Sequence, residues 1–297
     1  MTEIERPVLR SVLYMPANNE RALSKLPTLA CDAVIFDLED SVAPDTKSAA
    51  REQLRSFFRA GFNTHACKAI RINGVDTPWF TEDLMAARAC SPDAIVIPKV
   101  SKPAQLQLVE DALSETDAPK NINLWAMIET AAGVLNAGDI AANAGRLEAL
   151  ILGTNDLFKE VALVDENARD IAHPWLMQII LAAKANSIAA VDGVFNNFRE
   201  QQAFETECIK GASMGFDGKT LIHPAQIETA NSCFAPRDEE LAKARAIVSA
   251  FAMSENADKG VISLGGKMVE RLHLEQASAL LARQASIEAR QIAREEK

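Results

Sequence analysis

The sequence lacks the features that mark secreted, membrane-spanning and disulfide-stabilised proteins. Its five cysteines are odd in number and form no CxxC pair, so we expect neither a disulfide framework nor a zinc site. No run of about 18 apolar residues is present, which argues against a membrane span. The N-terminal MTEIERPVLR is charged and has no apolar segment typical of a secretory signal. We therefore expect a cytoplasmic protein without a membrane partner.

Clusters of basic residues are missing as well. The net charge is −10 and no run of Lys or Arg stands out. Nucleic acids and acidic membranes attract clustered positive charge, so no nucleic-acid partner is expected. Neither GxGxxG nor GxxxxGK[ST] follows an expected strand, which disfavours the open sheets that bind nucleotides.

Short apolar runs alternate with longer amphipathic stretches through most of the 297 residues. The runs predict strands over 11–15, 33–38, 68–72, 94–98, 123–128, 149–152, 187–191 and 218–222. The amphipathic stretches predict helices over 47–60, 80–89, 103–113, 132–144 and 174–185. This alternation is typical of parallel βαβ units. Eight such units, in about 250 residues, close a (β/α)8 TIM barrel. We therefore predict an α/β fold with a catalytic barrel over residues 1–235.

The pattern changes from Pro236 onward. Helices are expected over 238–252 and 274–293, with a glycine-containing turn over 263–267 between them. The segment is too short for us to expect a separate core. Residues 236–297 are predicted to form a C-terminal helical extension that packs on the barrel or on a neighbouring subunit.

In such barrels the active site forms at the C-terminal ends of the strands. Polar residues stand at these positions after most of the predicted strands. In chain order from the second strand, the strands deliver Asp37, Glu39 and Asp40; Arg71 and Asn73; Lys99; Glu129; Asp156; Asp192; and His223. So many polar groups at one end are not needed for stability. Their convergence predicts an active site.

Each of these residues also has a structural interpretation. Asp40 and Asp192 could be helix N-caps or solvated loop residues, and Asp156 could cap the helix that follows it. Glu129 directly follows an apolar, buried stretch, where an unpaired carboxylate is costly. Arg71 is similarly enclosed, so an ion pair between Arg71 and Glu129 is the structural alternative. His173 and His223 each precede a proline, and loop shaping is their default role.

Four of the carboxylates suit a hard cation: Glu129, Asp156, Asp37 and Glu39. Magnesium takes oxygen ligands, usually one or two carboxylates completed by water and substrate. Arg71 would face a substrate carboxylate or a developing oxyanion. Schiff-base chemistry at Lys99 is an alternative, but it leaves the carboxylates without a role.

Several blocks of sequence carry a family resemblance: RSVLYMPANN, DAVIFDLEDSVAPDTKSAAR, IRING, AIVIPKV, MIETAAGV, EALILGTNDL, GFDGKTLIHPAQIETAN and GKMVE. In this order they resemble the citrate lyase beta subunit-like family of the HpcH/HpaI aldolase/citrate lyase superfamily. That family includes malyl-CoA, citryl-CoA and citramalyl-CoA lyases. The resemblance runs from about Arg10 to about Leu281.

The resemblance implies a magnesium-dependent carbon–carbon lyase. Its substrate would be a 3-hydroxy-carboxyacyl-CoA, cleaved to an acyl-CoA thioester and a 2-oxo acid, or formed from them. By family analogy Glu129 and Asp156 are the metal ligands, and Arg71 binds the oxo-acid fragment. Asp37 and Glu39 would hold metal-bound waters or orient Arg71.

The resemblance also implies a coenzyme A region and an oligomer. The block SVLYMPANNERALSKL resembles the family's coenzyme A region, which makes Asn18, Arg21 and Lys25 candidate contacts. A homotrimer, or a multiple of one, is implied, with the C-terminal extension reaching a neighbour's site. The family's DGKMVD block ends in an aspartate that serves as acid/base from the adjacent subunit. Here the block reads GGKMVE, so Glu270 offers a carboxylate on a longer arm, for the same role, for another substrate or as a surface residue.

Other functions on the same scaffold stay open at this point. A thioesterase would hydrolyse the acyl-CoA, and an aldolase would cleave a free 2-oxo acid. A non-catalytic subunit of a larger lyase complex is a further alternative, including one that acts on an acyl carrier protein. The products, rather than the sequence, distinguish these possibilities.

Overall fold

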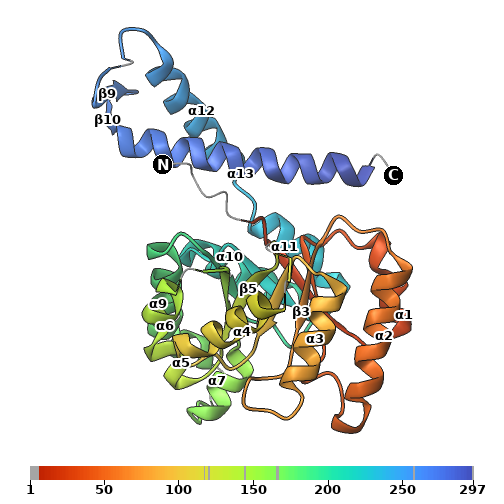
Figure 1. Ribbon diagram of the computed structural model, residues 1–297. Helices are drawn as coiled ribbons and strands as arrows, with labels where there is room; N and C mark the ends of the chain where they lie inside the picture. Colours follow the sequence, from red (N-terminus) through yellow and green to blue (C-terminus); the bar gives the residue numbers. More distant parts are fainter. Residues whose placement is uncertain are drawn as a thin grey trace. The chain divides into compact units, whose positions relative to one another are not determined.

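Eight parallel strands close into a barrel in which each strand pairs with the next and β8 pairs with β1 (Figure 1). The structure is a computed structural model that describes residues 7–295, apart from 117, 120, 144, 165, 166 and 257. The strands are β1 Ser11–Pro16, β2 Ala33–Asp37, β3 Cys67–Arg71, β4 Ala94–Ile97, β5 Asn123–Ile128, β6 Leu147–Leu152, β7 Ala189–Asp192 and β8 Gly218–Leu221. Each overlaps a predicted strand, and the predicted (β/α)8 barrel is confirmed.

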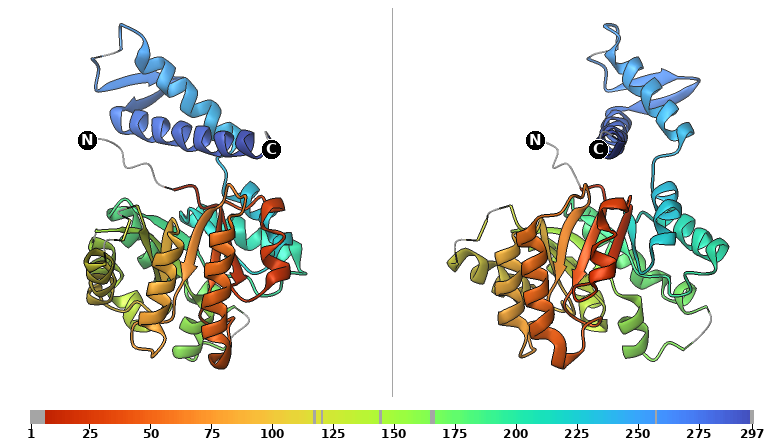
Figure 2. Two further views of the ribbon diagram at one scale, coloured as in Figure 1. Left: turned by 45° about the vertical axis from the view of Figure 1, so that its right-hand side comes forward. Right: turned by 90° about the vertical axis from the view of Figure 1, so that its right-hand side faces the viewer.

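Helices between the strands cover the outside of the barrel (Figure 2). They are α1 Glu20–Leu23, α2 Lys47–Ala60, α3 Phe80–Cys90, α4 Pro103–Glu115, α5 Ala131–Leu135, α6 Ala137–Ala142, α7 Thr154–Glu160, α8 Ala168–Ile171, α9 His173–Ala185, α10 Gln201–Met214 and α11 Ile227–Cys233. Short 3-10 turns lie at η1 Leu26–Thr28, η2 Pro44–Thr46 and η3 Pro224–Gln226.

The prediction of a single helix over 132–144 is wrong, because two helices, α5 and α6, occupy this stretch. Asn136 lies between them with φ −97° and ψ 8°, outside the helical region. Its side-chain amide donates to the carbonyl of Ser101 at 2.8 Å, which ties the break to the loop after β4. Ala144, the predicted last residue, lies outside the described residues.

The barrel interior is apolar below its C-terminal mouth. Inward-facing residues form one cluster, in which the fully buried Trp125 packs with five alanines: Ala33, Ala69, Ala94, Ala149 and Ala189. Since side chains alternate along a strand, the next inward positions toward the C-terminal ends include Tyr14, Arg71 and Glu129. The barrel therefore has an apolar floor, and its polar inward residues gather at the mouth.

Residue contacts divide the chain into two units, Met1–Phe234 and Ala235–Lys297. The second unit contains α12 Asp238–Ala252, β9 Val261–Leu264, β10 Lys267–Glu270 and α13 Arg271–Glu295. It has a buried cluster of its own, which was not expected for so short a segment, with Ile247, Phe251 and Ile262 among its members. Whether this unit packs on a neighbouring subunit stays a prediction.

The glycine-containing turn predicted over 263–267 is part of a β-hairpin that the sequence analysis missed. β9 and β10 pair antiparallel, with Leu264 opposite Lys267. Gly265 and Gly266 have φ of 58° and 76°, as a two-residue hairpin turn of the type I′ kind requires. Across the described part of the chain, none of the helices is long and apolar enough to span a membrane.

Candidate active site

Arg71 is fixed at the barrel mouth by Asp37. The two residues are register partners at the ends of β3 and β2. Arg71 Nε donates to Asp37 Oδ1 and Nη2 to Oδ2, each at 2.7 Å, which is the planar two-bond geometry that favours guanidinium–carboxylate pairs. Burial opposes ionisation of Asp37, but the Arg71 guanidinium outweighs it and lowers the pKa of that carboxyl. Asp37 therefore remains charged and orients Arg71.

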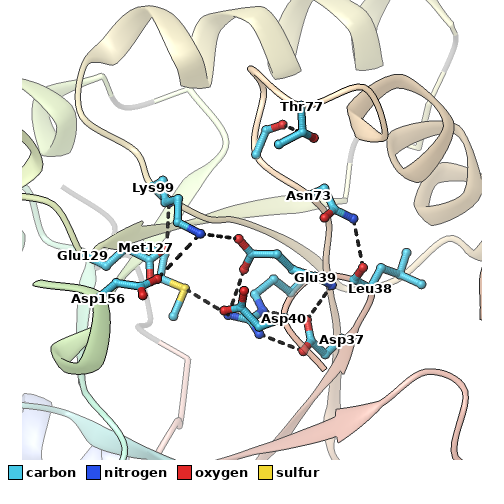
Figure 3. A network of polar contacts seen from close by, with 12 residues as sticks. Asp37, Leu38, Glu39, Asp40, Asn73, Thr77, Lys99, Met127, Glu129 and Asp156 are labelled. Carbon is cyan, nitrogen blue, oxygen red and sulfur yellow. Dashed lines mark hydrogen bonds and ion pairs between the residues drawn. The ribbon is translucent and has the colours of Figure 1, made fainter. Parts of the chain in front are cut away.

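The segment after β2 adds two further carboxylates, Glu39 and Asp40, near Asp37 (Figure 3). Arg71 Nη1 lies 3.0 Å from Glu39 Oε2 and 3.5 Å from Asp40 Oδ2. The segment itself is held in place because Asn73 Nδ2 donates to the Leu38 carbonyl at 2.9 Å. Within the described residues Arg71 pairs with these carboxylates and Asp37. The structural alternative of an ion pair between Arg71 and Glu129 is therefore not formed.

Glu129 is a buried carboxylate at the end of β5 without a cationic partner among the described residues. It is 2% exposed, and its Oε1 accepts a hydrogen bond from the backbone N–H of Lys99 at 2.8 Å. Burial, with a contribution from the charge of Glu39, raises the pKa of Glu129 to about 7. A carboxylate in this state is stabilised in its charged form by any cation brought beside it.

Lys99 links the carboxylates on the two sides of the mouth. Its Nζ donates to Glu39 Oε1 at 2.8 Å and lies 3.6 Å from Asp156 Oδ2. Its backbone has φ 53°, in the left-handed region that a lysine seldom adopts. A strained backbone conformation persists only where the surrounding contacts hold it in place, and such residues are common in binding sites.

Asp156 lies in the first turn of α7, and its side chain is 37% exposed. The N-cap of this helix is Gly153, and no side chain caps it by a hydrogen bond. The helix-capping alternative for Asp156 is therefore wrong. Its carboxylate instead faces Lys99 and the same cavity as Glu129.

A cavity of about 350 Å³ brings five of the ten predicted strand-end residues together. Its lining includes Tyr14, Asp37, Asp40, Ser41, Arg71, Met127, Glu129, Leu152, Gly153, Thr154, Asn155, Asp156, Val194, Thr220 and Ile222. Arg71, Glu129 and Asp156 thus share one cavity, as the convergence of strand ends predicted. Glu39 takes part through its contacts with Arg71 and Lys99.

The donor set fits a hard divalent cation. Glu129 and Asp156 present carboxylate oxygens to one cavity, and these two residues would hold the ion. Among the described residues no group of three or more His, Cys, Asp or Glu side chains could hold a metal by itself. Two protein carboxylates match magnesium, which keeps several waters and takes further oxygens from substrate.

Two residues that the sequence analysis missed shape this site. Tyr14, the one tyrosine in the sequence, places its ring 4.9 Å from the Arg71 guanidinium. Gly153 lies against Glu129, because a Cβ at this position would come within 2.4 Å of Glu129 Cβ. The inward register of Tyr14 on its strand and the glycine directly after β6 were the available signals.

Three of the remaining predicted residues belong to the barrel unit and do not line the cavity. Asn18, Arg21 and Lys25 are exposed in and beside α1, after the C-terminal end of β1. Glu270 is half-buried at the end of β10 in the second unit, and its backbone N–H donates to His273 Nδ1 at 3.0 Å. Their roles in coenzyme A binding and acid/base chemistry stay predictions.

Asp192 and His223 have structural partners. Asp192 is fully buried and pairs with Lys219 at 2.9 Å and Arg169 at 2.6 Å, so its interpretation as an N-cap or solvated residue is wrong. His223 is the N-cap of η3, and its Nδ1 accepts a hydrogen bond from the backbone N–H of Ala225 at 3.1 Å. The loop-shaping role predicted for His223 is confirmed.

A closed (β/α)8 barrel with convergent charged residues at its C-terminal mouth defines a barrel of the catalytic type. The HpcH/HpaI aldolase/citrate lyase family model matches residues 10–224. The chain belongs to this family.

Individual relatives span nearly the whole chain. A (3S)-malyl-CoA thioesterase of Cereibacter sphaeroides is 45% identical, over 94% of this chain and 96% of that protein. An L-malyl-CoA/beta-methylmalyl-CoA lyase of Rhodobacter capsulatus is 31% identical, over 94% and 95% of the two chains. The crystal structure of CitE from Mycobacterium tuberculosis in complex with magnesium, acetoacetate and coenzyme A has a TM-score of 0.73 and 28% identity, and covers 95% of this chain and 99% of that one.

Proposed function

We propose that this protein is a magnesium-dependent enzyme that hydrolyses the thioester of a short 3-hydroxy-carboxyacyl-CoA of the malyl type. The geometric observation that carries the proposal is one cavity lined by a buried, fixed guanidinium and four carboxylates, two of which, Glu129 and Asp156, would hold the metal ion. The higher identity to a malyl-CoA thioesterase than to a malyl-CoA lyase favours hydrolysis as the net reaction.

The substrate class follows from the charges in the cavity. Arg71, locked by Asp37, is a preorganised cation for a carboxylate or for an oxygen that gains negative charge. Glu129 and Asp156 would hold magnesium, which supplies Lewis-acid polarisation of a bound carbonyl or hydroxyl oxygen. A short acid with a carboxylate and a neighbouring oxygen satisfies both features.

Glu270 is proposed as the acid/base group, supplied by the same chain or by a neighbour in a homotrimer. In hydrolysis its carboxylate would take a proton from the attacking water, whose oxygen bonds to the thioester carbon as the coenzyme A thiolate leaves and is protonated. Asn18, Arg21 and Lys25 are proposed to contact coenzyme A, because they follow the end of β1 at the mouth.

Carbon–carbon cleavage is the second candidate, and the similarity to a malyl-CoA lyase and to CitE favours it. The 3-hydroxyl would lose its proton, the carbon–carbon bond would break to give a 2-oxo acid, and the thioester enolate would be protonated at carbon. Arg71 would stabilise the moving negative charge in this reaction. The two reactions therefore need the same cavity and differ in the role of Glu270. It would take a proton from water in hydrolysis and give a proton to the enolate carbon in carbon–carbon cleavage.

The test is a product analysis. Each stereoisomer of malyl-CoA is incubated with the protein and magnesium, and both products are identified by mass. Free coenzyme A with malate supports hydrolysis, whereas acetyl-CoA with an equal amount of glyoxylate supports the lyase. Glu129→Gln, which keeps the shape of the side chain, should remove turnover without lowering the melting temperature. Turnover that persists in this variant contradicts the assignment of the site.

A further inference from the structure

Tyr14 reaches across the mouth of the barrel. It lies on β1, and its hydroxyl is 3.8 Å from the thioether of Met127 on β5, the strand on the opposite side of the eight-stranded barrel. Its ring packs against the apolar barrel interior, and the Arg71 guanidinium lies over it. The hydroxyl is thereby placed toward the centre of the barrel, beside Met127.

The hydroxyl lacks a good hydrogen-bond acceptor within the described part of the chain. Its one hydrogen bond there is to the Met127 sulfur, and a thioether is a weak acceptor. Burial raises the pKa of Tyr14 well above its ordinary value, against the effect of Arg71. The phenol is therefore a neutral donor at any working pH, and its donor is poorly used in the protein alone.

Packing accounts for an aromatic ring at position 14 but not for its hydroxyl. A phenylalanine would pack on the same cluster and beneath the same guanidinium. Tyr14 is half-buried and lines the cavity, and its protein acceptor is weak, so packing gives no reason for the hydroxyl. The cavity that Tyr14 lines is also lined by the charged residues Arg71 and Glu129 and by the apolar residues Leu152, Val194 and Ile222. An oxygen of a small acid bound in this cavity would supply a stronger acceptor.

We infer that the Tyr14 hydroxyl donates a hydrogen bond to an anionic oxygen of the bound hydroxy or oxo acid and is a specificity-determining residue of the site. The inference rests on the proposed function for the class of substrate. It adds a second donor to the cavity, next to the Arg71 guanidinium that lies over the tyrosine ring. Acids without an oxygen at this place should bind less well, because they leave the phenol unpaired.

Tyr14→Phe tests the inference, because it keeps the ring and removes only the hydroxyl. Loss of a hydrogen bond to a charged oxygen should lower kcat/KM for malyl-CoA roughly 10- to 100-fold. The melting temperature should be unchanged or higher, and magnesium affinity should be unchanged. Thr206→Ala, which removes an exposed hydroxyl on α10, is the control and should leave all three quantities as in the wild type.

Binding is measured without turnover by carbon NMR of protein labelled at the tyrosine Cζ, which gives a single signal because the chain has one tyrosine. Oxalate with magnesium serves as the probe and should move this signal. A signal that stays in place while calorimetry records oxalate binding overturns the inference, as does a Tyr14→Phe enzyme within twofold of wild type. A wild-type protein that turns over no hydroxyacyl-CoA and binds no oxalate overturns the proposed function together with it.

Discussion

Gly153→Ala should inactivate the enzyme by displacing Glu129. The added Cβ would lie 2.4 Å from Glu129 Cβ and 2.5 Å from Oε2, whereas carbon atoms pack at about 3.5–4.0 Å. The backbone does not offer room, because Gly153 N–H donates to the Ile128 carbonyl at 3.1 Å within the paired ends of β5 and β6. Glu129 Cβ is fixed to the backbone, so rotation of the side chain cannot relieve this contact. The strand ends that carry Gly153 and Glu129 must be forced apart by about 1 Å, a displacement of the carboxylate that can cost roughly 100-fold in catalysis.

The same overpacking should lower stability by about 1–3 kcal/mol. For a chain of this size that is a fall of several degrees in melting temperature, at about 2–4 °C per kcal/mol. Gly138→Ala is the matched control. No atom lies within 4 Å of a Cβ placed at Gly138, which is helical, so alanine there should raise stability by about 0.5–1 kcal/mol and leave activity unchanged.

The assay compares kcat/KM for malyl-CoA, the magnesium dissociation constant by calorimetry, and the melting temperature of wild type and both glycine variants. Gly153→Ala should lose about 100-fold in kcat/KM and bind magnesium more weakly. If Gly153→Ala keeps both quantities within twofold of wild type, Glu129 is not held by this contact and the reasoning is refuted.

Three further predictions use the same site. Because the pKa of Glu129 is raised to about 7, protons compete with magnesium for this carboxylate below that pH. The magnesium affinity measured by calorimetry should therefore rise up to about tenfold per pH unit toward pH 7 and level off above it. Glu129→Gln should remove this pH dependence. Asp37→Asn should lower the free energy of unfolding in urea by about 3 kcal/mol, since one partner of a buried pair loses its charge, and an effect below about 1 kcal/mol would contradict the importance of this pair. Removal of magnesium by EDTA should abolish turnover, and added magnesium should restore it; calcium, with longer and less regular coordination, should restore less.

The sequence predicts the barrel well, because each strand is a short apolar run and amphipathic stretches mark several of the helices, although α10 and α11 lie outside the predicted ranges. The convergence of Arg71, Glu129 and Asp156 follows from the same rule, since the C-terminal ends of parallel strands meet at one face. The partners of Asp192 could not be predicted, because Lys219 and Arg169 come from other elements and become neighbours only in three dimensions.

Two other features depend on information that local sequence patterns carry weakly. The hairpin over 261–270 has strands of four residues, too short for alternation to stand out from its helical surroundings. Tyr14 occupies an ordinary inward strand position, and its significance arises only from Met127 on the opposite strand and Arg71 two strands away. Contacts across a barrel are long-range, so no window of sequence contains them.

The charges around the mouth impose an order on binding. Five carboxylates gather there: Asp37, Glu39, Asp40, Glu129 and Asp156. Only two cations, Arg71 and Lys99, are among their ion-pair partners in the described chain, which leaves three excess negative charges when all groups are ionised. The raised pKa of Glu129 is one consequence of burial within this cluster.

An anionic thioester that enters this mouth meets repulsion unless a dication is already present. Binding of magnesium would leave one excess negative charge and lower the repulsion on a second anion, in addition to supplying its coordination sites. We therefore expect magnesium to bind first, so that the KM for malyl-CoA falls as magnesium rises while malyl-CoA analogues bind poorly to the metal-free protein. Equal affinity of an analogue for the metal-free and metal-bound protein, measured by calorimetry, would show that the carboxylates do not control entry.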